Sequence, residues 1–209
     1  MRRATAGACA GTDVRYACGM RITGGGARGI PLQVPKGDAT RPAMDRLRQA
    51  GFSSLAARSE GVHFVDLFAG SGAYGLEAWS RGATGGVFVE KAREPLLCLQ
   101  TNLAAVARSR RGDPAVCAVM RADALSWTPL DGARCGLVFA DPPYALCELE
   151  ARRIFAQFDR LLETGPTGLA VFEMPGDLQV EEPGWECIKR LGGSGPSAAS
   201  ACFYRRIAT

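Results

Sequence analysis

Short hydrophobic runs alternate with longer amphipathic stretches from residue 61 onward. β-prone runs, rich in branched and aromatic side chains, occupy residues 62–67, 86–90, 115–120 and 136–140. Patterns with helical spacing begin at Ala73 and at Arg93, after the first two runs. Strands that alternate with helices in this way are typical of parallel βαβ units. We therefore predict an α/β domain with a mostly parallel sheet.

The C-terminal part predicts one long helix and three more strands. The helix is expected to follow Tyr144 and to end before Gly165 and Pro166. Its apolar face is formed by Ile154, Phe155, Phe158, Leu161 and Leu162. Further β-prone runs cover residues 168–172, 185–191 and 200–207. The sheet is thus expected to have seven strands and to end in a hairpin.

The N-terminal quarter has a different pattern. Residues 20–35 predict a hairpin around Gly24-Gly25-Gly26, and a helix is expected from Pro42 because proline is favoured at the first helical position. Residues 1–19 lack periodicity and are expected to form a disordered extension. The predicted organisation is this extension, a hairpin-and-helix segment at residues 20–58, and a main domain at residues 59–209.

Composition excludes several classes of protein. The chain has 209 residues, 47% of them hydrophobic, which is enough for one full α/β core. No apolar run approaches the roughly 20 residues of a membrane span, and no secretory signal is evident, so we expect a cytoplasmic protein.

Cysteine and histidine usage narrows the chemistry. The eight cysteines form no C-x-x-C pair, and we expect most of them to be small buried hydrophobic residues. His63 is the only histidine and is expected to be a packed or rim residue of its strand. Ser-His-Asp triads and multi-histidine metal sites are therefore excluded, and no metal is expected.

Positive charge is concentrated near the N-terminus. Residues 1–58 contain ten Lys or Arg and three Asp, a net charge of +7, whereas the rest of the chain carries −3. A basic segment beside a mildly acidic body predicts an arm that binds a polyanion. Solvated surface arginines are the alternative interpretation.

The segment Asp66-Leu67-Phe68-Ala69-Gly70-Ser71-Gly72 joins the first strand of the main domain to its first helix. Glycines at such a turn let the backbone approach a bound cofactor, and the start of the helix supplies free N–H groups. A plain tight turn is the alternative.

Acidic residues follow the next two strands at positions suited to a nucleoside. Glu90 comes 20 residues after Gly70, where a carboxylate can accept hydrogen bonds from ribose hydroxyls. Asp123 can accept one from an adenine amine, or can cap a helix instead. These groups fit S-adenosylmethionine. A nicotinamide cofactor uses a similar architecture, but no hydride-transfer residues are evident. The expected cofactor-binding residues are Asp66, Phe68, Gly70, Gly72, Glu90, Asp123 and Ala124.

The segment Asp141-Pro142-Pro143-Tyr144 follows the fourth strand of the main domain. Asp141 and the carbonyl of Pro142 can accept the two N–H groups of an exocyclic amine, which favours a pyramidal nitrogen with its lone pair directed toward a methyl donor. Tyr144 can stack on the base, a contact typically worth about 1–3 kcal/mol. The base must be flipped or looped out to reach these groups. A plain β-turn is the alternative. Asp141, Pro142 and Tyr144 are the expected catalytic residues.

Together these segments resemble the RsmD-type family of bacterial 16S ribosomal RNA guanine-N2 methyltransferases, from residue 20 to about residue 206. Both motifs above carry the resemblance, together with Met20-Arg21-Ile22-Thr23-Gly24-Gly25 and Arg41-Pro42. The resemblance implies a class I S-adenosylmethionine-dependent methyltransferase fold, with a Rossmann-like seven-stranded sheet and a small N-terminal hairpin and helix. The extra N-terminal residues and the Gly/Ser/Ala-rich connection at residues 192–200 depart from the family pattern.

The resemblance also implies a function and a partner. These are methyl transfer to a guanine N2 in 16S ribosomal RNA, on an assembling small ribosomal subunit. RNA contacts are expected from Arg21, Arg28 and Arg41, and the protein is expected to be a monomer.

Two other functions stay open. DNA adenine-N6 methylation also requires an exocyclic amine to be held with its lone pair directed toward the methyl donor. The 69 positions from Gly72 to Asp141 leave little room, however, for an inserted domain that reads DNA. A non-catalytic RNA-binding assembly factor could share the fold. Such a factor would be expected to lack Asp141, Tyr144 or the glycine turn, and all are present.

Overall fold

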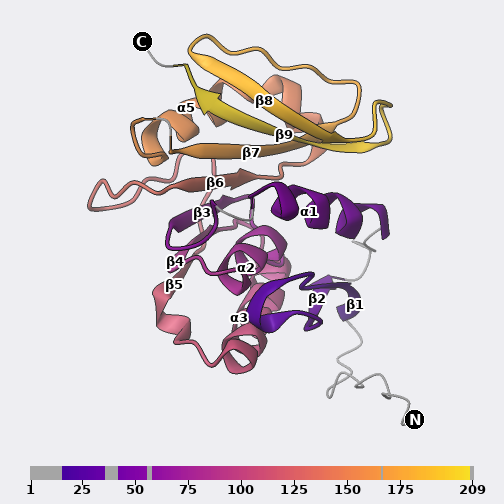
Figure 1. Cartoon of the computed structure of the whole chain (residues 1–209), viewed down its shortest axis with the longest axis vertical. Helices are drawn as coiled ribbons and strands as arrows, with labels where there is room; N and C mark the ends of the chain where they lie inside the picture. Colours follow the sequence, from indigo (N-terminus) through magenta and orange to yellow (C-terminus); the bar gives the residue numbers. More distant parts are fainter. Residues whose placement is uncertain (1–15, 36–41, 56–57, 166, 208–209) are drawn as a thin grey trace.

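A seven-stranded sheet forms the centre of the molecule in the computed structural model, which describes residues 16–35, 42–55, 58–165 and 167–207 (Figure 1). The strand order is β5-β4-β3-β6-β7-β9-β8. The strands are β3 (His63–Leu67), β4 (Gly85–Val89), β5 (Cys117–Met120), β6 (Leu137–Ala140), β7 (Leu169–Pro175), β8 (Trp185–Gly192) and β9 (Ala199–Arg206). Strands β3 to β7 are parallel, and β9 is antiparallel to β7 and β8. The predicted strand number and terminal hairpin are confirmed.

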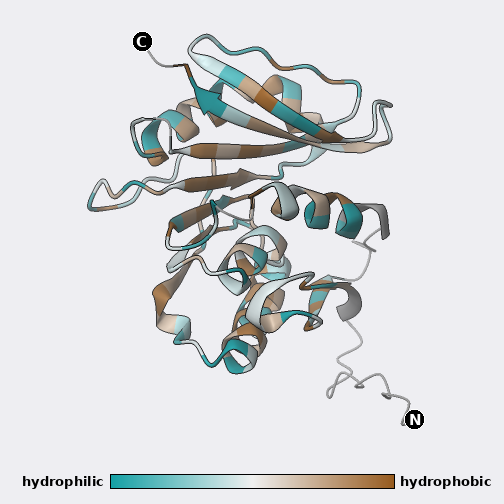
Figure 2. Ribbon diagram, in the orientation of Figure 1, coloured by the Kyte–Doolittle hydropathy of each residue, from teal (hydrophilic) through white to brown (hydrophobic). Residues whose placement is uncertain are grey.

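Helices cover both faces of this sheet. The helices are α1 (Pro42–Leu55), α2 (Ala73–Ser80), α3 (Arg93–Arg110), α4 (Tyr144–Leu149) and α5 (Ala151–Leu161). Alternate strand residues point to opposite faces: Phe64 and Phe139 pack with α1, α2 and α3, whereas Val65 and Val138 pack with α5. Burial on both faces explains why the central strands are almost continuously apolar, as the brown colour of β6 and β7 in Figure 2 shows.

The prediction of one long helix after Tyr144 is wrong in one respect, because the structure has two helices there, α4 and α5. The break falls at Glu150, which has φ −111° and ψ 9°. Cys147 of α4 and Phe155 of α5 are both buried, so each helix turns its own apolar side to the core. Neither Gly nor Pro marks the break, so the sequence offered no signal for it.

The hairpin consists of β1 (Tyr16–Arg21) and β2 (Pro31–Pro35), with the 3₁₀ turn η1 (Gly25–Ala27) in the connection. The hairpin begins at Tyr16, four residues before the predicted start at residue 20. Disorder is wrong for residues 16–19, which belong to β1, and residues 1–15 lie outside the described part. Pairing of β1 relies on backbone hydrogen bonds, which require no hydrophobic periodicity.

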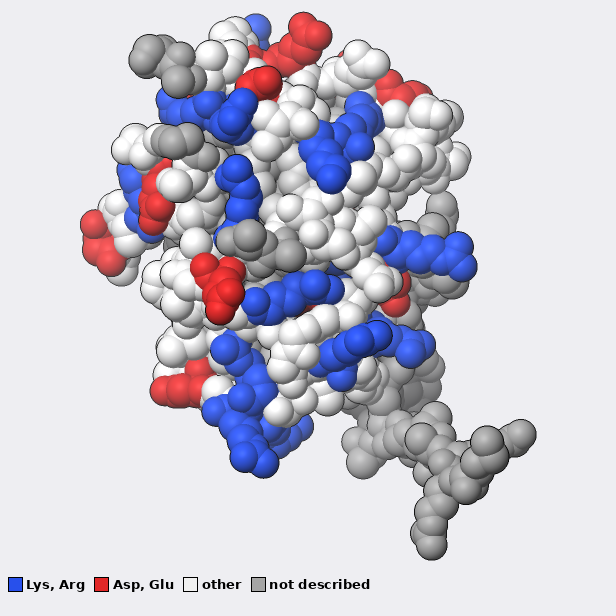
Figure 3. All heavy atoms as spheres, in the orientation of Figure 1, with Lys and Arg blue, Asp and Glu red and all other residues white. Residues whose placement is uncertain are grey.

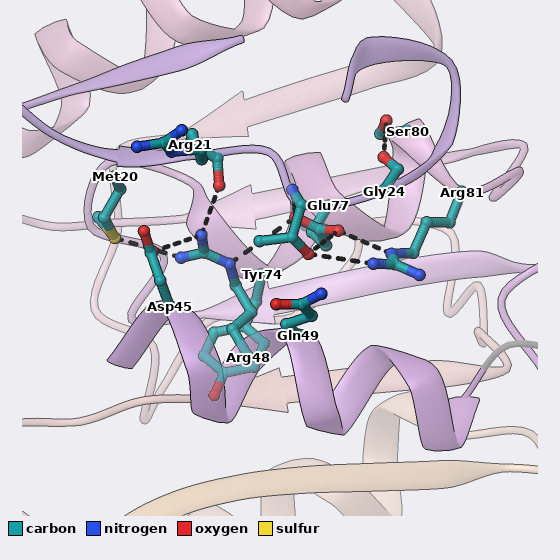
Figure 4. Close-up of polar contacts among 12 residues, drawn as sticks. Met20, Arg21, Gly24, Asp45, Arg48, Gln49, Tyr74, Glu77, Ser80 and Arg81 are labelled. Atoms are coloured by element: carbon teal, nitrogen blue, oxygen red, sulfur yellow. Dashed lines mark hydrogen bonds and ion pairs between the residues drawn. The ribbon is translucent and has the colours of Figure 1, made fainter. Parts of the chain in front are cut away.

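A buried carboxylate connects the hairpin to the helices (Figure 4). Glu77 of α2 is fully buried and accepts hydrogen bonds from Thr23 N and Thr23 Oγ1, both at 2.7 Å. Arg81 Nε donates to the same carboxylate at 2.7 Å, and Arg48 Nε lies 3.8 Å from it. Arg48 also donates to the carbonyl of Arg21 at 2.7 Å. One buried acid therefore joins the hairpin, α1 and α2.

Two neutral side chains complete this attachment. Ser80 Oγ donates to the carbonyl of Gly24 at 2.6 Å. Asn102 of α3 accepts from Gln33 N at 2.7 Å and donates to the carbonyls of Gln33 and Ser71, each at 2.9 Å. The hairpin is thus hydrogen-bonded to the helices and, through Asn102, to the turn after β3.

The burial of the cysteines and of His63 agrees with most of what composition predicted. Of the cysteines whose side chains are described, five are buried and Cys187 is exposed. His63 lies exposed at the start of β3, which makes it a rim residue. Within the described residues, no helix combines the length and apolar character needed to cross a membrane.

We predict that Glu77→Ala lowers the free energy of unfolding by about 3–5 kcal/mol, because it leaves the buried Arg48 guanidinium without one of its charge partners. The control is Glu186→Ala, which removes an exposed ion pair with Arg205 and should cost at most about 1 kcal/mol. Urea unfolding of both variants measures the difference. Equal losses would contradict a special role for the buried acid.

Candidate active site

The glycine loop, residues 68–72, links the end of β3 to α2. Phe68, Gly70 and Gly72 adopt positive φ values of 58°, 53° and 87°. A Cβ atom at Gly72 would lie 2.3 Å from Leu99 Cδ1 of α3, so a side chain there would displace Leu99 as well as strain a backbone with φ 87°. The sequence signal at these glycines therefore reflects a real backbone requirement.

Two carboxylates hold this loop. Asp66 accepts a hydrogen bond from Gly75 N at 2.8 Å, which satisfies one free N–H in the first turn of α2. Glu90, directly after β4, accepts from Gly70 N at 2.9 Å and from Ala92 N at 2.6 Å. Each Glu90 oxygen keeps acceptor capacity beyond these bonds, because a carboxylate offers about four lone-pair sites.

Asp123 occupies a different environment from the other expected cofactor residues. Its Oδ1 accepts from Leu125 N at 2.9 Å, and its carbonyl accepts from Trp127 N at 2.9 Å. The side chain is exposed and lines neither of the cavities described below, whereas Ala122 and Ala124 do line one. The structure shows Asp123 capping a turn, whereas the alternative considered from the sequence was a helix cap.

Two cavities share the glycine loop and meet at Asp141. The first has a volume of about 350 Å³, and the second about 470 Å³. Phe68, Gly70 and Asp141 line both. The first is also lined by Met20, Val34, Pro35, Arg48, Asp66, Tyr74 and Glu173. The second is also lined by Glu90, Ala122, Ala124, Pro142 and Tyr144.

The first cavity has an excess of acidic groups. Asp66, Asp141 and Glu173 line it, and Arg48 is the one cation among its described lining residues. Burial, with a smaller contribution from Glu90, raises the pKa of Asp66 to about 8. Burial and then the charges of Glu173 and Asp66 raise the pKa of Asp141, while burial raises that of Glu173. A cationic ligand would relieve this crowding of like charges.

Two buried polar atoms beside the first cavity lack hydrogen-bond partners among the described residues. Tyr74 donates its hydroxyl proton to Glu173 Oε2, which leaves Glu173 Oε1 without a donor. Arg48 Nε makes no hydrogen bond and has only its 3.8 Å approach to Glu77. Arg48 and Glu173 thus place one basic and one acidic side chain on the wall of this cavity.

The Asp-Pro-Pro-Tyr turn follows β6. Because β6 and β7 pair in parallel with Ala140 opposite Phe172, Asp141 and Glu173 are the next residues on neighbouring strands. Pro142 is buried and Tyr144, 40% exposed, begins α4 at the edge of the second cavity. The predicted catalytic residues therefore surround the place where the cavities meet.

The arginines expected to bind RNA belong to the hairpin and its continuation. Arg21 and Arg28 are both exposed, and Arg41 lies outside the described residues. Figure 3 shows Lys and Arg side chains spread over the whole of one face, from top to bottom, with Asp and Glu side chains between them. The described residues contain no group of three or more His, Cys, Asp or Glu arranged to hold a metal ion.

Sequence reasoning missed several residues that line the first cavity, namely Met20, Val34, Pro35, Arg48, Tyr74 and Glu173. One signal was available, since Glu173 is an acid inside the otherwise apolar run of β7, and a buried charge usually has a specific reason. The remaining residues come from the hairpin and from helices, where the pattern indicates burial but not the neighbours.

The chain matches one protein family and is similar to proteins named as rRNA methyltransferases. A model of the family described as "Conserved hypothetical protein 95" matches residues 20–195. "Ribosomal RNA small subunit methyltransferase D" of Escherichia coli (strain K12) is 38% identical over 125 residues, and the match spans 60% of each chain. "Putative rRNA methyltransferase YlbH" of Bacillus subtilis (strain 168) is 29% identical over 168 residues, 78% of this chain and 86% of that one.

A solved structure is similar over nearly the whole fold. It is titled "Putative methyltransferase yhhF from Escherichia coli" and superposes with a TM-score of 0.72 at 28% identity. The match covers 91% of this chain and 99% of that one. The expected class I methyltransferase fold is confirmed by this similarity and by the observed sheet.

We predict that Asp66→Asn stabilises the protein more at pH 8 than at pH 5. The folded state holds the Asp66 proton up to a pKa of about 8, whereas the unfolded chain releases it near 3.8. Rising pH across this window therefore costs the wild type stability, and Asn avoids the loss. Thermal unfolding at both pH values measures it, with Asp113→Asn in an exposed turn as the control. A stability difference that does not grow with pH would contradict the prediction.

Proposed function

The chain belongs to the family described as "Conserved hypothetical protein 95", the RsmD-type family that its sequence resembles, and on this premise we propose that it methylates RNA. The reaction is transfer of a methyl group from S-adenosylmethionine to the N2 amine of a guanine in 16S ribosomal RNA. The substrate is the assembling small ribosomal subunit, and the enzyme acts as a monomer in the cytoplasm.

One observation carries this proposal: Asp141 stands where two cavities meet, one beside Glu90 and the other beside an acidic cluster. A methyl transfer requires donor and acceptor to approach each other in line, and positioning of this kind accounts for much of the rate. A residue that borders both cavities can contact the acceptor amine while the donor occupies the adjoining space.

The residues present fit S-adenosylmethionine. Glu90 has acceptor capacity for ribose hydroxyls, and the glycine loop gives backbone access beside it. Arg48 and Glu173 are of opposite charge type and both line the first cavity, as an amino-acid group requires, and the surplus of acidic residues there favours a cation. When bound, this cofactor supplies an electrophilic methyl group on a positively charged sulfur.

The acceptor amine is held by groups at the end of β6. The Asp141 carboxylate and the Pro142 carbonyl accept its two N–H groups, and Tyr144 stacks on the guanine. Attack of the nitrogen electron pair on the methyl carbon would break the carbon–sulfur bond, whose electrons would leave on sulfur as a neutral thioether. The nitrogen would become positively charged and would then lose a proton. Asp141 accepts an N–H of the amine and can therefore take this proton, and burial together with the charges of Glu173 and Asp66 raises its pKa, which makes it a stronger base.

The RNA partner is supported by charge on the hairpin. Arg21 and Arg28 are exposed there, and Met20, Val34 and Pro35 of the same hairpin line the first cavity. Phosphates bound by these arginines would therefore lie near the site of transfer.

The function is tested by incubating small subunits that lack the modification with labelled S-adenosylmethionine, followed by nucleoside analysis. N2-methylguanine in 16S RNA is the expected product. N6-methyladenine in DNA would favour the DNA methyltransferase alternative, and no transfer to either would favour a non-catalytic assembly factor.

We predict that Asp141→Ala abolishes this transfer while calorimetry still detects cofactor binding, because the proposed partner of Asp141 is the amine. Asp131→Ala, in an exposed turn, is the matched control and should retain full activity. An Asp141→Ala enzyme with a near-normal rate would rule out the proposed amine geometry.

We predict that Glu90→Ala weakens S-adenosylmethionine binding by about 1.5–3 kcal/mol, the range for hydrogen bonds to a charged group. Glu94→Ala, at an exposed site in the first turn of α3, should leave the affinity unchanged. Isothermal calorimetry compares the two, and equal affinities would argue against a ribose contact at Glu90.

A further inference from the structure

A third cavity, of about 740 Å³, lies between α1 and the connection from β8 to β9. We call it the α1–β9 groove. Its α1 side is lined by Arg46, Leu47 and Ala50, and its other side by Leu191, Gly192, Gly193 and residues 197–199. This connection is the Gly/Ser/Ala-rich segment that departs from the family pattern, and the proposed reaction gives it no role.

The groove shares one lining residue with the proposed site of the target base. Tyr144 lines both the groove and the second cavity. A guanine stacked on Tyr144 stays covalently linked to its neighbours in the RNA chain, so an adjacent nucleotide must lie close to that ring. The groove adjoins Tyr144, and no residue of the glycine loop lines it.

The lining of the groove suits a nucleotide. Most of its walls are Gly, Ala and Ser, which leave room for a flat base, and none of its described lining residues is acidic. Arg46 is exposed at its edge, where a guanidinium can pair with a phosphate. Asp45, the acid beside it in sequence, is already paired with Arg48 at 2.8 Å.

The connection that forms one wall is held in place by hydrogen bonds. Gly193 N donates to the Ala199 carbonyl at 3.1 Å, and Gly176 N donates to the Ala198 carbonyl at 2.8 Å. Arg190 donates to the Gly176 carbonyl at 2.8 Å. A wall fixed in this way loses little conformational entropy when a ligand binds.

We propose that the α1–β9 groove binds the single-stranded nucleotide next to the target guanine, with Arg46 on its phosphate. The proposal rests on the proposed function and extends it by assigning the path of the RNA. Stacking and phosphate contacts of this kind are general means of binding unpaired nucleotides.

A matched pair of serine variants tests the groove. Ser197 lines it and Ser194 does not, yet both are exposed residues of the same connection. Ser197→Glu places a negative charge inside the groove and should raise KM for small subunits about tenfold, equivalent to about 1.4 kcal/mol. Ser194→Glu should stay within about twofold of wild type. Both variants should bind S-adenosylmethionine with unchanged affinity by calorimetry.

Arg46→Ala provides an independent second variant. If Arg46 contacts a phosphate, the slope of log affinity for small subunits against log salt concentration should become shallower by about 0.7. Arg152→Ala, an exposed arginine on α5, is the control and should keep the wild-type slope. An unchanged slope for Arg46→Ala would overturn the phosphate contact.

Cross-linking identifies the class of partner. Irradiation of wild-type enzyme with small subunits whose RNA carries 4-thiouridine should join RNA to the peptide that contains residues 192–199. Cross-links confined to other peptides, or equal KM values for the two serine variants, would overturn the proposal. Absence of methyl transfer by the wild type would instead overturn the proposed function itself.

Discussion

The buried carboxylate of Glu77 is the interaction on which the shape of the site depends. A charge with no exposed surface is costly unless opposite charges and hydrogen bonds surround it. Arg48, Arg81 and Thr23 meet this need only when α1, α2 and the hairpin lie in one arrangement. Because Arg48 also lines the first cavity, the contact that satisfies Glu77 also builds a wall of the candidate active site.

The first cavity carries the opposite kind of electrostatics. Around Glu77 positive and negative groups are matched, whereas Asp66, Asp141 and Glu173 share the cavity with one guanidinium. Burial raises the pKa of all three carboxyl groups, and for Asp141 the charges of Glu173 and Asp66 raise it further. Proteins retain such local imbalance chiefly at functional sites, where a ligand supplies the missing charge. A sulfonium cofactor is a ligand of this kind.

The topology of the sheet explains why these groups converge. Asp66 lies near the carboxyl end of β3, and Glu90 and Asp141 directly follow β4 and β6. Glu173 lies within β7, at the level just past the end of β6, and all four strands run in parallel. Parallel pairing brings these ends to one edge, where ligands of open α/β sheets bind. Residues of the hairpin and of α1 line the first cavity at this edge. The other side of α1 lines the α1–β9 groove, where the proposed RNA path lies.

Local pattern alone determined the strands, the glycine loop and the Asp-Pro-Pro-Tyr turn, because strand periodicity and turn chemistry are properties of neighbouring residues. The 20-residue interval from Gly70 to Glu90 predicted a ribose contact at Glu90, and the structure adds that Glu90 accepts a hydrogen bond from Gly70 N. Only the tertiary structure decided that Asp123 caps a turn, that the helix breaks at Glu150, and that Tyr74 meets Glu173 across 99 residues. Hydrophobic pattern records which side of an element is buried. The pattern does not show which buried sides pack against each other. That packing decides which ionisable groups become buried neighbours, and their burial raises the pKa values at the site.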